Sequence, residues 1–225
     1  MNAQGKRSGE TAREYAYRMI REQVISLELK PGEAFNDMEF AAKIGVSRTP
    51  VREAVIQLSE ESRIIEIFPQ RGMRIAPIDV ELVEEARSLR VLLEKQIAGM
   101  CCEMATEEDI KWLQENVGLQ EFYMENSRPE MVMQLDDEMH HKLFMICHRE
   151  LTYGMCQKLA IHYDRIRSLS VNTVKDNTII EDHRKIIQFI AEHKKENAMA
   201  QMEKRLSRWQ LNEGKFRQEF PDYFK

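Results

Sequence analysis

The sequence predicts a mostly α fold, in which an N-terminal winged helix-turn-helix domain is followed by an all-helical antiparallel bundle. Apolar residues recur every three or four positions through most of the 225 residues, and only nine glycines and six prolines interrupt them. Two short apolar runs, 64–68 and 73–76, flank a Pro-Gln-Arg-Gly turn and predict one β-hairpin. No convincing strand follows this hairpin, so the remainder of the chain is expected to be helical.

The first domain is expected to occupy residues 1–76 and to contain three helices before the hairpin. Helical spacing of apolar residues predicts a first helix over residues 13–29, which a Pro-Gly pair ends. Shorter helices over residues 37–44 and 48–61 follow, with a Gly-Val turn between them. This succession is the layout of a helix-turn-helix motif, whose second helix enters the major groove of DNA.

The segment SRTPVRE, which starts at Ser47, gives the strongest functional signal. Ser47 fits an N-cap, and the proline lies in the first turn, where a missing N–H costs nothing. Arg48 and Arg52 lie four positions apart and therefore project from one side of the helix. In isolation such a pair would indicate solvated charges paired with Glu53 or Glu60. Beside a turn and a hairpin it indicates contact with DNA.

The net charge of −5 is unevenly distributed along the chain. Residues 1–75 carry 12 Lys and Arg against 11 Asp and Glu, a net +1, whereas the remainder carries 21 against 27, a net −6. Only the N-terminal part therefore has a charge compatible with approach to phosphate. The sequence has no long apolar run, no signal peptide and no paired cysteine motif, which predicts a cytoplasmic protein without a membrane partner.

The second domain is expected to occupy residues 80–220, after a linker over residues 76–79. Thr106 with Asp109, and Ser127 before Pro129, are typical helix start signals. The apolar periodicity predicts six helices, over residues 80–103, 107–125, 129–148, 152–170, 177–193 and 196–217.

The segments PGEAFND, GVSRTPVREAV and PQRGMRIAPI resemble the DNA-binding domain of GntR-family bacterial transcription regulators. The helical remainder resembles the FCD effector domain of the FadR subfamily. Some members carry a DNA-contacting arginine in the second helix, where this chain has Met38, so the operator sequence stays open. The resemblance implies DNA contacts from the recognition helix and from the tip of the wing, through Ser47, Arg48, Thr49, Arg52, Arg71, Gly72 and Met73.

A candidate metal site lies in the second domain. Asp136 and His140 lie four positions apart on one predicted helix face, and a carboxylate and an imidazole at that spacing can bind one divalent ion. The FCD resemblance implies two further histidine ligands, and His183 matches the first. The second falls at Arg205, whose guanidinium cannot donate a lone pair to a metal.

Three interpretations of this departure stay open. A divalent metal such as Zn or Ni binds more weakly, through Asp136, His140, His183 and waters. Alternatively, the Arg205 guanidinium takes the place of the metal, pairs with Asp136 and offers donors to an anionic effector. In the third, the last helix is aligned with the family in the wrong register, so that Arg205 is not the residue that matches the second histidine.

A further arginine is implied to belong to the effector site. Arg90, four positions before Glu94, matches an inward arginine of the family and could bind a carboxylate together with Arg205. The simpler interpretation is a surface ion pair between Arg90 and Glu94.

These observations favour a repressor or activator rather than an enzyme. The expected protein is a homodimer that binds a pseudo-palindromic operator in double-stranded DNA and responds to a small anionic effector, such as a carboxylate or a sugar acid. Two alternatives use Asp136, His140 and His183: a metal-sensing regulator and a metal-dependent hydrolase. No further residue is clearly placed as a general base, which disfavours the hydrolase.

Overall fold

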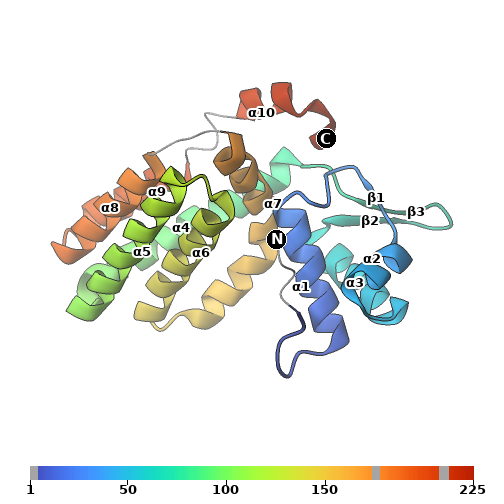
Figure 1. Cartoon of the computed structure of the whole chain (residues 1–225). Helices are drawn as coiled ribbons and strands as arrows, with labels where there is room; N and C mark the ends of the chain where they lie inside the picture. The colour runs from blue at the N-terminus through green and yellow to red at the C-terminus, as the bar shows by residue number, and fades with distance from the viewer. Residues whose placement is uncertain (1–4, 174–177, 208–212) are drawn as a thin grey trace. The chain divides into compact units, whose positions relative to one another are not determined.

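The computed structural model of the chain describes residues 5–173, 178–207 and 213–225 (Figure 1). Its contacts divide it into two compact units. One comprises the chain up to Val80 together with Arg217–Lys225, and the other comprises Glu81–Phe216. The predicted fold class is confirmed, because a winged helix-turn-helix precedes an all-helical bundle.

The first unit contains the three predicted helices, α1 (Ala12–Ile25), α2 (Asp37–Ile44) and α3 (Arg48–Ser62). The first helix ends four residues earlier than predicted, because Leu27 adopts a left-handed φ of 63°. Gly45 ends α2 with a left-handed φ of 73°, a conformation that glycine adopts without strain. This glycine sets the turn of the helix-turn-helix motif.

The wing is a three-stranded antiparallel sheet with the order β1-β3-β2. The predicted hairpin is present as β2 (Ile65–Phe68) and β3 (Gly72–Ile75), in a register that pairs Ile65 with Ile75. A third strand, β1 (Ala34–Phe35), pairs with β3 and was not predicted, since two residues are too few to show an alternating pattern. The hairpin extends away from the helices of its unit (Figure 1).

Packing of α1 on α3 orients the recognition helix. The apolar faces of the two helices are fully buried, and the opposite face of α3 is left in solvent. The buried residues at 0% exposure are Ala16, Ile20 and Val24 of α1, and Val51, Val55 and Leu58 of α3.

The C-terminal segment differs from its prediction. A single helix over residues 196–217 is wrong: α9 (Lys195–Leu206) ends at its C-cap, Ser207, and α10 (Glu213–Glu219) is separate. We expected the second domain to extend to residue 220, but the structure groups Arg217–Lys225 with the first unit. There the tail pairs with the linker residue Ile78, whose N–H donates to Tyr223 O at 2.7 Å.

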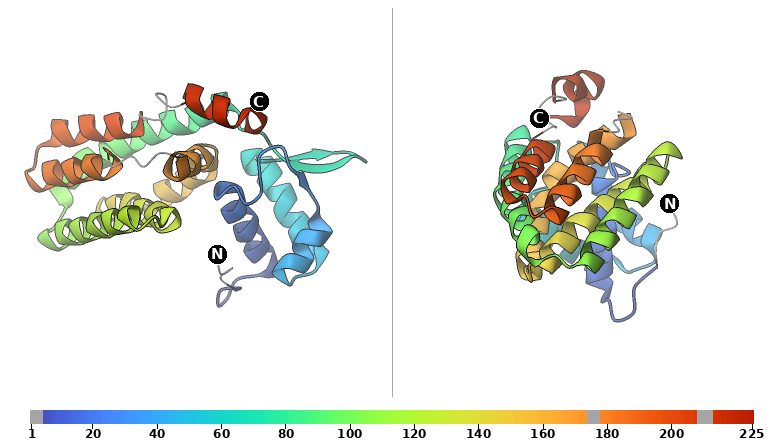
Figure 2. Two further views of the ribbon diagram at one scale, coloured as in Figure 1. Left: turned by 45° about the horizontal axis from the view of Figure 1, so that its top comes forward. Right: turned by 90° about the vertical axis from the view of Figure 1, so that its left-hand side faces the viewer.

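The second unit is a helical bundle in which α5 packs against α6 and α8, and α8 packs against α9 (Figure 2). Thr106 forms the predicted capping box with Asp109. Pro129 is at the first position of its helix, but Arg128 rather than Ser127 is the N-cap residue. The remaining helices are α4 (Val80–Met104), α5 (Glu107–Glu125), α6 (Pro129–Ile146), α7 (Glu150–Thr173) and α8 (Thr178–Ala191).

Candidate DNA interface and buried polar site

The start of α3 presents the predicted DNA-contacting residues to solvent. Ser47 is the N-cap by backbone conformation, although its hydroxyl makes no capping hydrogen bond. Ser47, Arg48, Thr49 and Arg52 are all exposed. An exposed polar edge over a buried apolar face is the arrangement that a recognition helix requires.

An ion pair orients one of the two arginines. Arg48 Nε lies 2.9 Å from Oδ1 of Asp37, a residue of α2 whose side chain is only 4% exposed. Arg48 therefore pairs across the helix-turn-helix turn, and the sequence suggested Glu53 or Glu60 instead. Within the described residues Arg52 makes no ion pair, so its guanidinium is the more available for a base edge.

The wing tip is exposed at Arg71 and Gly72 and half-buried at Met73. Gly72 has a φ of 99°, a conformation that other residues adopt only with strain. The tip therefore presents one cation on a narrow backbone, which suits a minor groove. Met38 is 62% exposed on α2, where it offers no charge to a phosphate.

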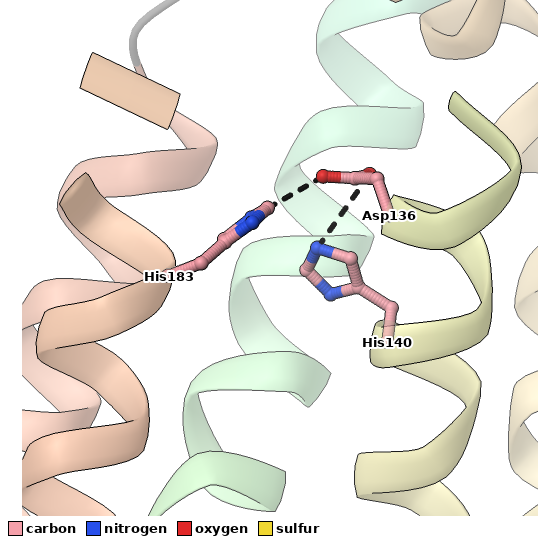
Figure 3. A group of neighbouring side chains, drawn as sticks. All are labelled: Asp136, His140 and His183. Carbon is pink, nitrogen blue, oxygen red and sulfur yellow. Dashed lines mark ion pairs between the residues drawn. The ribbon is translucent and has the colours of Figure 1, made fainter. Parts of the chain in front are cut away.

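A buried polar site lies inside the second unit. Asp136 and His140 lie one turn apart on α6, and His183 approaches them from α8 (Figure 3). His183 Nε2 lies 3.2 Å from Asp136 Oδ1, and His140 Nε2 lies 3.9 Å from Asp136 Oδ2. All three residues are buried. The structure thus brings together the three metal-ligand candidates.

Arg205 of α9 reaches into this site. Its Nε donates to His183 Nε2 at 3.2 Å, and its terminal NH2 donates to Asp136 Oδ1 at 3.1 Å. The bond from Arg205 requires His183 Nε2 to act as acceptor, so Nδ1 carries the proton and donates to Gln120 Oε1 at 2.9 Å. His183 is therefore neutral, and burial lowers its pKa to about 4.

Arg167 of α7 binds the other side of Asp136, and the sequence analysis missed it. Its guanidinium pairs with Asp136 Oδ2, with Asp164 Oδ1 at 2.7 Å and with Asp137 Oδ1 at 2.8 Å. Burial opposes the charge of Asp136, but Arg167 and the other cations outweigh it and hold its pKa well below the usual value. The only sequence signal was the Asp164–Arg167 spacing, which is equally typical of a surface ion pair.

The candidate metal ligands do not fit a divalent ion in this arrangement. One ligand atom from each of Asp136, His140 and His183 lies within 4.8 Å of the others. Both Asp136 oxygens, however, already contact a guanidinium, from Arg167 and Arg205. At about 4 Å and an effective dielectric constant of about 20, each would repel a divalent ion by about 8 kcal/mol. Arg205 supplies the positive charge that a metal would otherwise bring.

Arg90 and Glu94 face the interior rather than the surface. Arg90 Nε donates to Glu94 Oε1 at 2.6 Å, and both residues are 6% exposed. The second oxygen of Glu94 lies 2.5 Å from His140 Nδ1, so this carboxylate joins α4 to α6. Burial alone would raise the pKa of Glu94, but Arg90 and His140 lower it. The guanidinium of Arg90 also lies over the Tyr163 ring, 5.3 Å from its centroid.

Comparison with known families assigns both parts of the chain. Residues 12–75 match the model for bacterial regulatory proteins of the gntR family, and residues 85–208 match the FCD domain. The chain belongs to the GntR family. This GntR protein is a DNA-binding transcriptional regulator with an FCD effector-binding domain, and its relatives are regulators rather than enzymes. The hydrolase alternative is therefore wrong.

Relatives match the GntR protein over most of its length. It is 27% identical to the HTH-type transcriptional repressor RspR of Escherichia coli K12, over 92% of this chain and 91% of RspR. It is 30% identical to an HTH-type regulator in an unstable DNA locus of Streptomyces ambofaciens, over 82% of this chain and 78% of that regulator. The solved structure of E. coli McbR/YncC superposes with a TM-score of 0.75 at 18% identity, over 93% of this chain and 99% of McbR. That likeness shows the fold.

Among the described residues, no helix is both long enough and apolar enough to cross a membrane.

Acid should destabilise the bundle through His183. Because unfolded His183 takes up a proton near pH 6.5 and the folded residue only near pH 4, lowering the pH through this window favours the unfolded chain. Between pH 7 and pH 5 this group should cost about 2 kcal/mol. We expect His183→Gln to lose that part of the pH dependence in urea unfolding followed by circular dichroism. The control is His148→Asn, because His148 is exposed and asparagine tolerates its left-handed φ of 55°. This variant should keep the pH dependence of the wild-type protein.

Replacing Arg205 by histidine should create a metal site. Arg205→His removes a fixed cation and adds an imidazole beside Asp136 and His183, so zinc affinity should rise by about 100-fold or more. Arg205→Lys keeps the charge and should show no gain. Titration calorimetry with zinc alone measures both variants. Equal zinc affinities of Arg205→His and Arg205→Lys would contradict the interpretation that Arg205 occupies the place of a metal ion.

Proposed function

We propose that this GntR regulator releases or binds its operator in response to a small hydroxycarboxylate held in the buried polar site of the FCD domain. DNA binding and an effector-binding domain follow from the family, and the proposal adds the chemistry of the effector. The observation that carries it is unused hydrogen-bonding capacity at two neighbouring residues, in the terminal NH2 groups of Arg90 and in the buried Nε2 of His140.

These groups suit a ligand that is both an anion and a hydrogen-bond donor. Among the described residues, Arg90 hydrogen-bonds only through Nε, which leaves its terminal NH2 groups for a carboxylate. Nδ1 of His140 contacts Glu94 at 2.5 Å, whereas Nε2 of His140 is buried without a hydrogen bond. A ligand hydroxyl could donate to Nε2 of His140, which would satisfy a buried group that otherwise costs free energy.

The DNA-binding part of the proposal rests on the exposed residues of α3 and the wing. Arg48 and Arg52 would reach base edges in the major groove, and Arg71 with Gly72 would reach the adjacent minor groove. A homodimer would place two recognition helices on the half-sites of a pseudo-palindrome. Apolar side chains suited to a subunit contact lie one turn apart on α7, where Leu151 is 88% exposed and Met155 is 75% exposed.

Removing the recognition arginine should abolish specificity without unfolding the protein. Arg52→Ala is expected to weaken binding to an operator fragment selected from genomic DNA by about 10- to 100-fold and to leave non-specific binding nearly unchanged. Arg149→Ala removes one exposed charge from the bundle and should have no such effect. Fluorescence anisotropy at several salt concentrations measures both, and equal operator affinities would contradict base contact by Arg52.

Removing Arg90 should abolish effector binding. A thermal-shift screen of hydroxycarboxylates with three to six carbons should find ligands that stabilise the wild-type protein, and calorimetry gives their affinities. The affinity of these ligands should be about 10- to 100-fold lower in Arg90→Gln, because a charge-assisted hydrogen bond is lost. Arg87, one turn earlier on α4 and bound to Glu84, provides the control Arg87→Gln. If no hydroxycarboxylate binds the wild-type protein, or if Arg90→Gln and Arg87→Gln lose the same affinity, the proposed ligand chemistry is excluded.

A further inference from the structure

Two cysteines of the bundle lie in contact. Cys101 of α4 and Cys147, the residue after α6, place their sulfur atoms 3.5 Å apart, and both are almost fully buried. Each thiol also points at the backbone of the other helix. Cys101 Sγ lies 3.4 Å from Leu143 O, and Cys147 Sγ lies 3.6 Å from Ile97 O. The cysteines are thus aimed at each other across the gap between α4 and α6.

The same two helices meet at the effector site. Glu94 and His140 are in contact at 2.5 Å, and each cysteine lies seven residues further along its helix. Seven residues are two turns, about 10 Å of helix. The equal offset means that α4 and α6 run parallel and hold the same register at both levels. A change at the sulfur pair therefore acts on the elements that carry Arg90, Glu94, Asp136 and His140.

We propose that Cys101 and Cys147 are a redox-active pair that forms a disulfide between α4 and α6. A disulfide has an S–S distance of about 2.05 Å, so the sulfurs must approach by about 1.5 Å. Rotation of the two side chains with a small adjustment of the helices supplies this. The bond fixes the spacing of α4 and α6 beside the site, and its effect on the effector rests on the proposed function.

A peroxide supplies the oxidising equivalents. The Cys147 thiolate attacks one peroxide oxygen, the O–O bond breaks, and the leaving hydroxide takes up a proton, which gives a sulfenic acid and water. The Cys101 sulfur then attacks the Cys147 sulfur and releases a second water as the disulfide forms. In total, two thiols and one hydrogen peroxide give one disulfide and two waters.

The surroundings assign different roles to the two thiols. The hydrogen bond from Cys101 and the nearby Arg149 lower the pKa of Cys147, and the same hydrogen bond and burial raise the pKa of Cys101. Cys147 is also at the end of its helix, next to the exposed His148. Cys147 is therefore the thiol that meets the oxidant, and Cys101 is the thiol that resolves the sulfenic acid.

The other two cysteines serve as internal controls. Cys102 follows Cys101 in the chain, but its sulfur points elsewhere, toward Ala98 O at 3.5 Å and Phe189 O at 3.9 Å. Cys156 lies on α7 and is buried. Within the described part of the chain neither sulfur lies in contact with another cysteine sulfur, so neither should join a disulfide in the folded protein.

The experiment treats the reduced full-length protein with hydrogen peroxide, blocks the remaining thiols with an alkylating agent and maps the peptides by mass spectrometry. We expect a Cys101–Cys147 crosslink, a loss of about 2 Da per chain, alkylated Cys102 and Cys156, and reversal by dithiothreitol. Cys147→Ser should block the reaction, and Cys102→Ser should not. A sulfinic acid at Cys147 with free Cys101, a different pairing, or no oxidation would overturn the proposal.

Two further measurements test the proposal on the wild-type protein and without any effector. The same treatment in urea should give mixed pairings, so a Cys101–Cys147 crosslink of equal yield in urea would show that the fold does not select the pair. Amide hydrogen exchange around Glu94 and His140 should slow after oxidation of the wild-type protein. Unchanged exchange there would overturn the link between the disulfide and the effector site, whatever ligand that site binds.

Discussion

The bundle interior is organised around one buried negative charge, the carboxylate of Asp136. It is 3% exposed, yet its pKa lies far below that of an ordinary aspartic acid. Arg167 from α7 and Arg205 from α9 bind its two oxygens, and His183 from α8 lies against it. Four helices therefore meet at one carboxyl group. Each arginine compensates part of this buried charge, and breaking a buried ion pair typically costs about 3–5 kcal/mol, so the packing of these helices depends on the whole set.

A guanidinium and a metal ion can both neutralise that carboxylate, but they have different consequences. A bound metal exchanges with solution and responds to its supply, whereas Arg205 is part of α9 and carries its charge permanently. A guanidinium also presents planar, directed donors, which fixes the protonation of His183 through the bond to Nε2. The positive charges of the buried polar site are thus part of the protein itself. Hydrogen-bonding capacity remains unused at the terminal NH2 groups of Arg90 and at Nε2 of His140.

Local signals in the sequence were sufficient for the winged helix-turn-helix, because glycine, proline and apolar periodicity act over a few residues. The resemblance to the FCD domain also implied that Arg205 lies beside His183. Arg167 and the inward direction of Glu94 could not be predicted, since a charged residue four or three positions from its partner has the same pattern on a surface and in a core. The pairing of Ile78 with the tail was hidden for a related reason, because backbone hydrogen bonds leave no mark on side-chain types.

The return of the tail gives the two units a second covalent connection. The chain passes from the first unit to the bundle after Val80 and returns to the first unit after Phe216. The residues next to both boundaries include Ile78 and the C-terminal tail, which pair with each other. The N–H of Ile78 donates to Tyr223, and Lys225 donates its own N–H to Ile78 O at 3.0 Å. The linker is thus held by backbone hydrogen bonds to the last residues of the chain. Both connections to the bundle therefore start from one backbone pairing within the first unit, between Ile78 and the last residues of the chain.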